Sequence, residues 1–584
     1  MGTEASLIKD QNSNPAAYQD PKRNSKQLLE SLPPDFREAV SANTHLFSYL
    51  QDILAMSYTV PAYYTQLSRS LMNLENINVI YPVGGPLFIH VYSEHAGARA
   101  MYHCVEPIIP LRSQDLLHVM GEAVAYRIKE DFEFKVEEEH IAKLKEILAS
   151  AVSITNDTKE LGEFHYDDRN RVVYTNEETY KVLEYTLIKN KVGLGVIDPL
   201  IKDSYIEDIS CDGVGSIFIE HRIFSSCETT INFDNKRELD SYAKTLSERS
   251  GRPATFRRPI IDAVLPDGSR LNLVFGEELS MKGSNFTIRK FAAVPLSITQ
   301  LCTYNTMDFM EAAYLWMLLE EGYNVWVCGE TASGKTTTLK GMCTFIKPEA
   351  KVLTIEDTPE VILPHDNWIR EATRQGEDEA SSIGIFELLK SALRQRPNYI
   401  IVGEIRGKEG LIAFQAMQTG HGVMATFHAS SVLKMIQRLT GYPIEVPKTY
   451  IDILNAVVIQ SAVRNPKTGK PDRRVMSISE IVGYDPVEQS FNYVDLFKWN
   501  PTTDDHEFAG IGTSYLLEER LAMMRGISRR EVRKIYDELE SRAEILRILA
   551  KREIFDYYEV WSYIKQISGL GIEKSLSMLK NGEM

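Results

Sequence analysis

The spacing of apolar residues changes several times along the chain, and each change predicts a different kind of structure. Residues 1–33 are polar and have no hydrophobic period, which is typical of a disordered or loosely attached tail. Residues 34–170 mix short apolar strands with helical periods, which predicts a small α+β domain. A second α+β domain is predicted for residues 171–292, where the turn Pro266-Asp267-Gly268-Ser269 separates two strands.

Individual elements of these two domains can be placed from the same patterns. We expect residues 45–71 to be largely helical with a break at Pro61, and a hairpin around the turn residues Gly84 and Gly85. The other expected helices are 114–129, 137–151, 177–189 and 236–247. The expected strands are 79–81, 87–92, 206–210, 216–219, 260–265, 270–275 and 284–291.

The second half of the chain has a different pattern. Within residues 293–510, after an expected helix at 307–321, apolar strands alternate with helical stretches, which is the signature of a mostly parallel sheet. Residues 511–584 are predicted to be almost wholly helical, with opposite charges spaced as on solvated helix faces. The predicted fold class is therefore α/β, preceded by smaller α+β domains and followed by a helical C-terminal region.

Composition narrows the class of partner. The chain has 584 residues, 65 basic and 81 acidic side chains and a net charge of −16, which argues against broad binding to nucleic acid or to an acidic membrane surface. The six cysteines form no C-x-x-C pair, so we expect reduced thiols and no zinc site. No apolar run approaches the roughly 18–20 residues that span a bilayer, which predicts a cytoplasmic protein.

The stretch from Gly329 to Thr336 fits the phosphate-binding pattern G-x-x-x-x-G-K-S/T at every fixed position. An expected strand at residues 323–328 precedes it and an expected helix at 337–345 follows, as the motif requires. Lys335 is expected to neutralise the β- and γ-phosphates, and the Thr336 hydroxyl to ligate Mg²⁺. The residues expected to hold the nucleotide are Gly329, Glu330, Thr331, Ala332, Ser333, Gly334, Lys335, Thr336 and Thr337.

Two further apolar strands end in carboxylates. Residues 398–406 lead to Glu404, which at the carboxyl end of a parallel strand would lie near the Mg²⁺ ion and the γ-phosphate. Residues 351–357 lead to Glu356 and Asp357, either of which is a candidate for activating the attacking water. A phosphate-binding loop alone does not hydrolyse ATP, because hydrolysis also needs a carboxylate on the metal side and a group that activates water. These carboxylates are the candidates for those two tasks.

Two histidines frame a third segment, residues 419–429. His421 follows a glycine at the start of the expected strand, and His428 ends it. A histidine beside a nucleotide site can sense the γ-phosphate or position the groups around it. We expect these two histidines to have that role.

These four motifs occur in the order and spacing of the Walker A, Asp box, Walker B and His box motifs of the secretion ATPases of type II and type IV systems, which they resemble. The resemblance covers residues 192–481, and that superfamily includes the motors of type IV pili. The stretches 198–209 and 388–397 are similar to its archaeal branch, which includes the archaellum motor. The absence of a four-cysteine module, which bacterial type II relatives usually carry, also favours that branch.

The resemblance implies a homohexameric, RecA-like ATPase that uses ATP and Mg²⁺. Nucleotide would lie between this domain and a smaller, PAS-like domain at residues 171–292, whose Arg270 and Arg289 would close onto the phosphates. Arg257 and Arg258 are further candidates for that task. The family also implies a polytopic membrane platform protein as partner, and a location at the inner face of the cell membrane.

Three functions remain open at this point. The first is an ATPase that powers assembly of an archaeal type IV pilus-like filament, an archaellum or a type II-like secretion apparatus. The second is a DNA-transfer or other nucleic-acid-translocating motor, which the charge of −16 disfavours. The third is a scaffold that binds ATP with little hydrolysis, which the full set of Glu356, Glu404 and His428 disfavours. The family does not distinguish extension from retraction.

Overall fold

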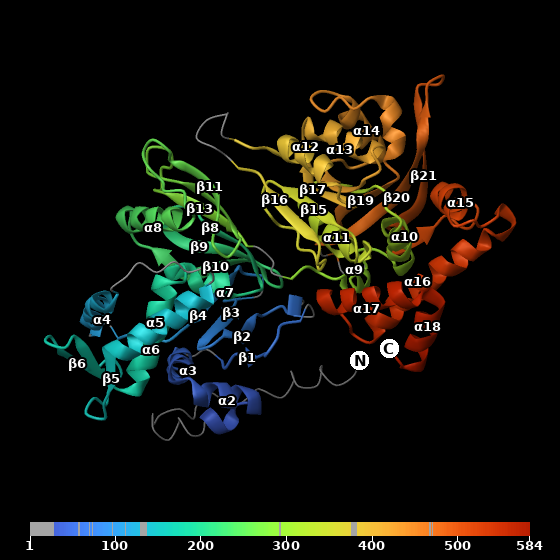
Figure 1. Cartoon of the computed structure of the whole chain (residues 1–584). Coiled ribbons are helices and arrows are strands. Elements are labelled where there is room, and N and C mark those ends of the chain that lie inside the picture. Colours follow the sequence, from blue (N-terminus) through green and yellow to red (C-terminus); the bar gives the residue numbers. More distant parts are fainter. Residues whose placement is uncertain are drawn as a thin grey trace. The chain divides into compact units, whose positions relative to one another are not determined.

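The computed structural model describes residues 28–584, apart from residues 57–58, 69–70, 73, 96, 111–112, 129–136, 291–293, 375–381, 467–468 and 470. The predicted tail at residues 1–33 therefore lies largely outside the described residues, although residues 28–31 are helical. The chain divides into two compact units, one ending at residue 291 and the other beginning at residue 292 (Figure 1). Each unit is described by itself below.

The N-terminal unit is built on one large sheet. Among the described residues, its strand order is β1-β2-β3-β4-β10-β9-β8-β13-β12-β11. The strands are β1 (Ala62–Tyr63), β2 (Asn78–Gly84), β3 (Leu87–Tyr92), β4 (Ala100–Val105), β8 (Ile206–Cys211), β9 (Gly215–His221), β10 (Ser225–Phe233), β11 (Ile260–Val264), β12 (Arg270–Val274) and β13 (Asn285–Arg289).

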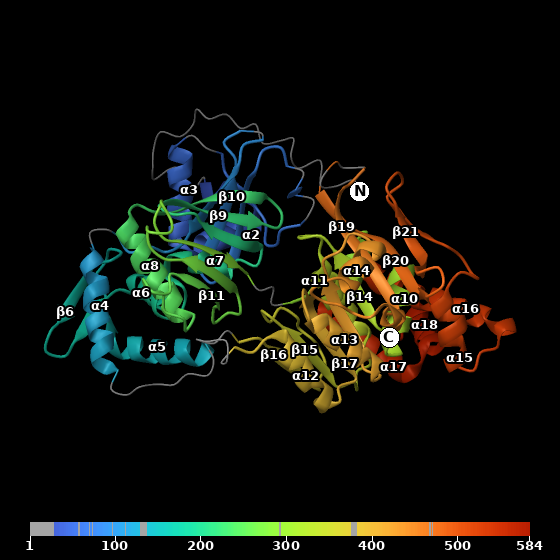
Figure 2. The ribbon, with the colours of Figure 1, turned by 90° about the horizontal axis from the view of Figure 1, so that it is seen from above.

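Helices and a second, small sheet complete this unit. The helices are α2 (Pro34–Ala42), α3 (Thr44–Ala55), α4 (Gln114–Arg127), α5 (Glu137–Ala151), α6 (Glu177–Lys191), α7 (Asp198–Lys202) and α8 (Lys236–Arg249), with the short 3-10 turn η4 (Gly195–Ile197). The small sheet has the order β5-β7-β6, from β5 (Val152–Ile154), β6 (Phe164–Asp167) and β7 (Val172–Thr175). It shares a core with α4, α5 and α6, and these elements lie together in Figure 2.

Two predictions for this unit need correction. Helix α3 ends at Ala55 and the chain then enters β1 at Ala62, so the helix expected to reach residue 71 is wrong beyond Ala55. The β-branched residues Thr59 and Val60 before Pro61 favour extended backbone, because proline restricts the residue that precedes it. The expected border between residues 170 and 171 cuts across the large sheet, because β4 pairs in parallel with β10.

The C-terminal unit contains the alternating strands and helices. Among its described residues the strand order is β16-β15-β17-β18-β14-β19-β20-β21-β22. The strands are β14 (Val325–Gly329), β15 (Val352–Glu356), β16 (Trp368–Ala372), β17 (Tyr399–Ile405), β18 (Gly422–Phe427), β19 (Ala456–Arg464), β20 (Pro471–Asp485), β21 (Ser490–Asn500) and β22 (Asp505–Phe508). The pairs from β16 to β19 are parallel, and β20 to β22 extend the sheet by antiparallel pairing.

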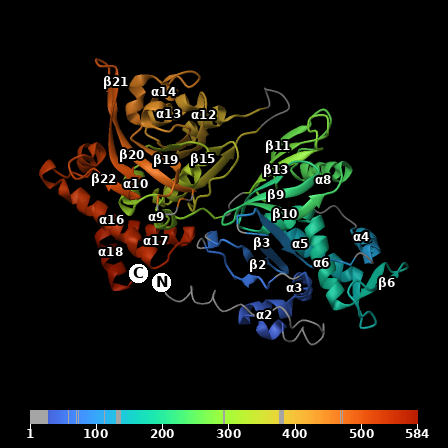
Figure 3. The same ribbon diagram turned by 180° about the vertical axis from the view of Figure 1, so that it is seen from behind.

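Helices cover both faces of this sheet. They are α9 (Ile298–Thr303), α10 (Phe309–Glu320), α11 (Lys335–Met342), α12 (Ile385–Gln395), α13 (Glu409–Gln418), α14 (Val432–Thr440), α15 (Ala522–Met524), α16 (Arg533–Lys551), α17 (Tyr557–Leu570) and α18 (Ile572–Asn581). Shorter turns are η5 (Cys343–Phe345), η6 (Lys448–Ile453), the π-helical η7 (Leu516–Leu521) and η8 (Arg529–Glu531). Helices α12, α13 and α14 lie on one side and the C-terminal helices on the other (Figures 1 and 3).

The side chains of the central strand β14 pack against the helices on both faces of the sheet. Its five residues are all buried, with Val325 and Val327 in the core shared with α10 and the C-terminal helices. Trp326 and Cys328 point into the opposite core, with α13 and α14. Alternate residues of one strand thus enter two cores, as expected for a parallel sheet covered on both faces.

The C-terminal helices are an integral part of this unit. Glu480 of β20 is fully buried and accepts hydrogen bonds from the Tyr314 hydroxyl at 2.7 Å, the Ser514 hydroxyl at 2.6 Å and the Leu516 backbone N–H at 3.0 Å. Leu516 packs in the same core as Trp316 of α10. The predicted helical character of this region is confirmed, and the fold class is the expected α/β.

Within the part of the chain that the structure describes, none of the helices combines the length and the apolar character needed to cross a bilayer.

Candidate nucleotide-binding site

The phosphate-binding motif forms a tight loop between β14, which ends at Gly329, and α11, which begins at Lys335. Gly334 has a φ of 92°, the left-handed region that glycine enters without strain. A Cβ at Gly329 would lie 2.2 Å from the Gln460 carbonyl oxygen and 2.5 Å from the Ser333 hydroxyl. The strand, loop and helix predicted from the motif are confirmed, and close packing against the backbone of β19 requires a glycine at position 329.

The tips of three neighbouring strands bring Lys335, His428 and Glu404 together. The Lys335 ammonium donates to the Glu330 carbonyl at 2.8 Å and lies 3.5 Å from His428 Nδ1. On the other side of the ring, His428 Nε2 lies 2.6 Å from Glu404 Oε1. Burial lowers the pKa of Lys335, while the Glu404 charge opposes this shift. The predicted convergence of the lysine with two strand ends is therefore present within one unit.

Two arginines hold this arrangement in place. Arg406 Nη2 lies 2.5 Å from Glu404 Oε2, and this bond is the main reason why the pKa of Arg406 is raised. Arg438 on α14 donates to the His428 carbonyl, and its guanidinium lies 5.0 Å from the centre of the Phe427 ring. Burial, and then the Lys335 charge, lower the pKa of His428. The histidine thus stands as a neutral bridge between a cation and a carboxylate.

Glu356 is the buried member of the carboxylate pair at the end of β15. It is 2% exposed, and its Oε1 accepts hydrogen bonds from the Glu360 and Val361 backbone N–H groups, each at 3.0 Å. Burial raises the pKa of Glu356 to about 7. A Cβ at Gly403 would lie 3.0 Å from Glu356 Cγ, so this carboxylate packs directly beside the strand that carries Glu404. Asp357, by contrast, is exposed and lies near Thr373, with 3.4 Å between Oδ1 and the hydroxyl oxygen.

The polar groups of the loop and of the first turn of α11 fit a phosphate and a hard cation. Within the described residues, the buried Ser333 hydroxyl has no hydrogen-bond partner. Thr336 lies in the first turn of α11 and is half-buried. Its hydroxyl and the Glu404 carboxylate are oxygen donors of the kind that Mg²⁺ accepts together with phosphate oxygens. The chemistry of this donor set therefore fits Mg²⁺ bound to a nucleotide.

His421 is not part of this cluster, so the expectation that both histidines act at the phosphates is wrong for it. Its Nδ1 is 2.8 Å from the Pro397 carbonyl oxygen, at the start of β18. His428 follows the other end of that strand, about 23 Å away at the usual rise of ~3.3 Å per residue. His421 instead ties the start of β18 to the loop before β17.

Arg270 and Arg289 belong to the N-terminal unit, where they lie opposite one another on β12 and β13. Arg270 pairs with Asp262, with 2.9 Å between Nη2 and Oδ2, and Arg289 pairs with Asp208, with 3.1 Å between Nε and Oδ1. Arg257 and Arg258 are exposed in the loop before β11. The action of these arginines on phosphate stays a prediction.

Sequence reasoning missed two residues that contact the phosphate-binding loop. Gln460 of β19 is 2% exposed and lies opposite Gly329 in the parallel register. Arg473 of β20 donates from Nε to the Ala332 carbonyl at 3.2 Å. Neither belongs to a recognisable motif, and both reach the loop through strand pairing that no local pattern records.

Several known proteins are similar to this chain in sequence. The family model described as "Type II/IV secretion system protein" matches residues 190–492. An uncharacterized protein of Methanocaldococcus jannaschii, MJ0900, is 42% identical over 549 residues, which cover 92% of this chain and 98% of that protein. The type IV secretion system protein VirB11 of Bartonella quintana is 27% identical over 246 residues, 36% of this chain and 68% of VirB11.

Among solved structures, the Legionella pneumophila ATPase DotB is similar, with 18% identity and a TM-score of 0.37 over 65% of this chain and 93% of DotB. The family match covers more than half of the chain and includes every motif of the site in the C-terminal unit. The chain therefore belongs to the type II/IV secretion system protein family.

Proposed function

We propose that the protein binds and hydrolyses ATP with Mg²⁺, and that hydrolysis drives a motor for filament assembly or secretion. The observation that carries this proposal is the contact chain from Lys335 through His428 to Glu404, at 3.5 Å and 2.6 Å. A loop that only bound phosphate would not need a carboxylate and a histidine aligned with its lysine. Such an alignment suits the end of the nucleotide where the bond breaks.

Each side chain then has a distinct task. Lys335 neutralises charge on the β- and γ-phosphates, while Thr336 and Glu404 hold Mg²⁺. The ion, when bound, polarises the phosphoryl oxygens and orients the triphosphate. Glu356 accepts a proton from the attacking water, since a pKa of about 7 places it in the range where a general base works best at neutral pH. His428 reports the state of the γ-phosphate to the rest of the sheet.

The larger machine is part of the same proposal. The protein would act as a homohexamer at the inner face of the cell membrane, and ATP turnover would move its two units against each other. Arg270 and Arg289 would supply positive charge to the phosphates, since guanidinium groups keep their charge and bind two oxygens at once. The output would be force on a polytopic membrane platform protein that assembles a pilus-like filament, an archaellum or a secretion apparatus of the archaeal type. The 42% identity to the archaeal protein MJ0900 supports the archaeal part of this proposal.

Phosphate release from ATP tests the proposal. We expect Mg²⁺-dependent turnover by the full-length protein, and a loss of about 100-fold or more in Lys335→Ala and in Glu404→Gln, because each removes charge stabilisation at the phosphates. Lys347→Ala is the matched control, since this lysine is exposed and pairs with Glu321 at 3.7 Å. Unchanged turnover in Lys335→Ala would refute the proposed site.

A further inference from the structure

Arg473 places a second cation on the phosphate-binding loop. Its Nε donates to the Ala332 carbonyl at 3.2 Å, and its Cδ lies 3.1 Å from the position that a Cβ on Gly334 would occupy. The side chain is exposed, and its two terminal guanidinium nitrogens have no partner among the described residues. The Ala332 carbonyl therefore occupies one N–H group of the Arg473 guanidinium, and the other N–H groups remain available to a ligand.

The strand order shows which half of a nucleotide this cation would meet. Strands β17 and β18, which lead to Glu404 and His428, lie on one side of β14. Strands β19 and β20, which carry Gln460 and Arg473, lie on the other side. Since the Lys335 ammonium is only 3.5 Å from His428, the γ-phosphate end belongs beside β18. The α-phosphate, ribose and base must then extend toward β19 and β20.

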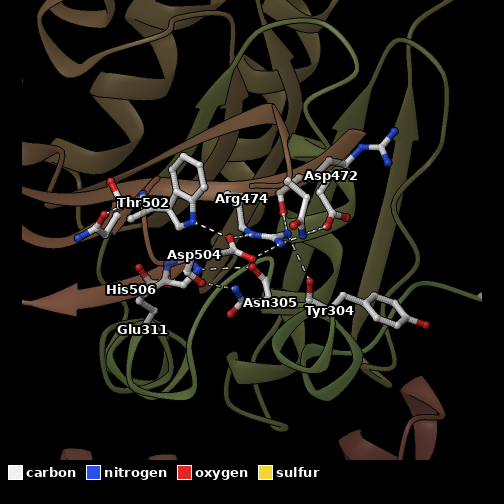
Figure 4. A network of polar contacts seen from close by, with 12 residues as sticks. Tyr304, Asn305, Glu311, Asp472, Arg474, Thr502, Asp504 and His506 are labelled. Carbon is white, nitrogen blue, oxygen red and sulfur yellow. Dashed lines mark hydrogen bonds and ion pairs between the residues drawn. The ribbon is translucent and has the colours of Figure 1, made fainter. Parts of the chain in front are cut away.

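A buried network on β20, drawn in Figure 4, fixes the face of the strand to which the Arg474 side chain points. The next residue, Arg474, is 1% exposed and binds the Asp504 carboxylate twice, from Nε at 2.8 Å and from Nη2 at 3.0 Å. Arg474 also donates to Asp472 at 3.1 Å and to the Tyr304 carbonyl at 3.4 Å. Because neighbouring side chains of a strand point to opposite faces, a locked Arg474 holds Arg473 toward the loop.

A purely structural role for Arg473 does not explain this arrangement. Among the described residues its side chain bonds to the Ala332 carbonyl in an exposed loop, and such a bond to a solvated acceptor contributes little to stability. A guanidinium is instead well suited to a flat or anionic ligand, because its plane stacks on aromatic rings and its donors bind oxygen in pairs. We propose that Arg473 binds the nucleoside half of ATP, by contact with the ribose and base, and so sets nucleotide affinity without acting in hydrolysis.

This inference rests on the proposed function, and its test separates the two. Full-length protein would be titrated with ADP and, separately, with inorganic tripolyphosphate, which has no nucleoside. We expect Arg473→Ala to weaken ADP binding about tenfold and to leave tripolyphosphate binding within twofold of the wild type. In Arg473→Ala the KM for ATP should rise while kcat at saturating ATP stays unchanged. The ADP affinity and the KM of Arg473→Lys should lie between those of the wild type and those of Arg473→Ala.

The control variant is Arg464→Ala on the neighbouring strand β19, where Nε donates to the Gly469 carbonyl at 2.9 Å and the side chain is exposed. It should bind both ligands as the wild type does. Wild-type protein that binds neither ligand would overturn the proposed function itself. If the wild type binds ADP and Arg473→Ala binds it equally well, only the role of Arg473 is overturned. Equal weakening of ADP and tripolyphosphate would also overturn it, since the residue would then act on the phosphates or on the loop.

Discussion

The Arg474–Asp504 pair gives the sharpest stability prediction. In Arg474→Met the side-chain volume is nearly kept, but Asp504, which is 4% exposed, loses both bonds to the guanidinium. The carboxylate keeps the Trp499 indole N–H as a donor at 3.0 Å, and a hydrogen bond from Asn305 also helps to lower its pKa. A buried charge left without its partner typically costs about 3–5 kcal/mol.

The pKa of Asp504 gives a second measure of the same interaction. The hydrogen bond from Arg474 is the main cause that lowers this pKa from 3.8 to about 2. That difference corresponds to about 2 kcal/mol of stability, which is present above pH ~4 and is lost as the pH falls toward about 2. This free energy includes only the interaction of the charged Asp504 carboxylate. Removal of the arginine also takes a donor from Asp472 and from the Tyr304 carbonyl, so we expect a total loss of about 3–4 kcal/mol.

Urea unfolding followed by tryptophan fluorescence is the appropriate assay. All five tryptophans lie in the C-terminal unit, so the signal reports this unit and not the N-terminal one. The double variant Arg474→Met/Asp504→Asn is the control, because asparagine removes the charge and tolerates the left-handed backbone at this position, where φ is 61°. We expect it to recover about half of the loss. A cost below about 1 kcal/mol in Arg474→Met, or a double variant less stable than the single one, would refute the reasoning.

The remaining predictions concern turnover and the C-terminal helices. Glu356→Gln should lower ATP turnover about 100-fold with ADP affinity unchanged, as stopped assays and titration would show. Because the pKa of Glu356 is raised to about 7, its base form is lost below that pH, and wild-type turnover should fall about tenfold per pH unit there. Gly403→Ala should reduce turnover more than stability, since its Cβ would lie 3.0 Å from Glu356 Cγ. Glu480→Gln should lower the free energy of unfolding in urea by about 1–3 kcal/mol, because one of the buried groups that donate to Glu480 then loses its acceptor.

The parts of the site that could be predicted are those specified by residues close together in the sequence. The Lys335 loop needs a strand before it and a helix after it, and both are visible as short-range patterns. Glu404 and His428 follow apolar strands, and parallel strands with helical crossovers place such ends at one edge of a sheet. His421 matched the same pattern, but it lies beside Pro397 at the start of β18, at the opposite end of the strand from His428. Asp357 is exposed where Glu356 is buried, and a role for Asp357 in activating water stays a prediction.

Long-range pairing accounts for what was missed. Arg473 reaches the loop because β20 folds back antiparallel on β19, with Ala462 opposite Arg473. Arg474 meets Asp504 through the next hairpin, 30 residues along the chain. Neither register can be read from hydrophobic spacing, since many registers would bury equally apolar faces. The same limit explains why residues 34–170 and 171–292 were expected to form separate domains.

The pairing of β4 with β10 also constrains how the protein is made. Ala100 of β4 lies opposite Cys227 of β10, so the first strands of the large sheet emerge from the ribosome more than a hundred residues before their neighbour. At the usual ~5–20 residues per second, that edge waits for roughly 6–25 s with its backbone groups unsatisfied. During this interval other nascent chains can pair with the exposed edge of β4, and chaperones can bind to it. A shortened protein that starts at residue 171 would keep β10 exposed in the same way for its whole lifetime.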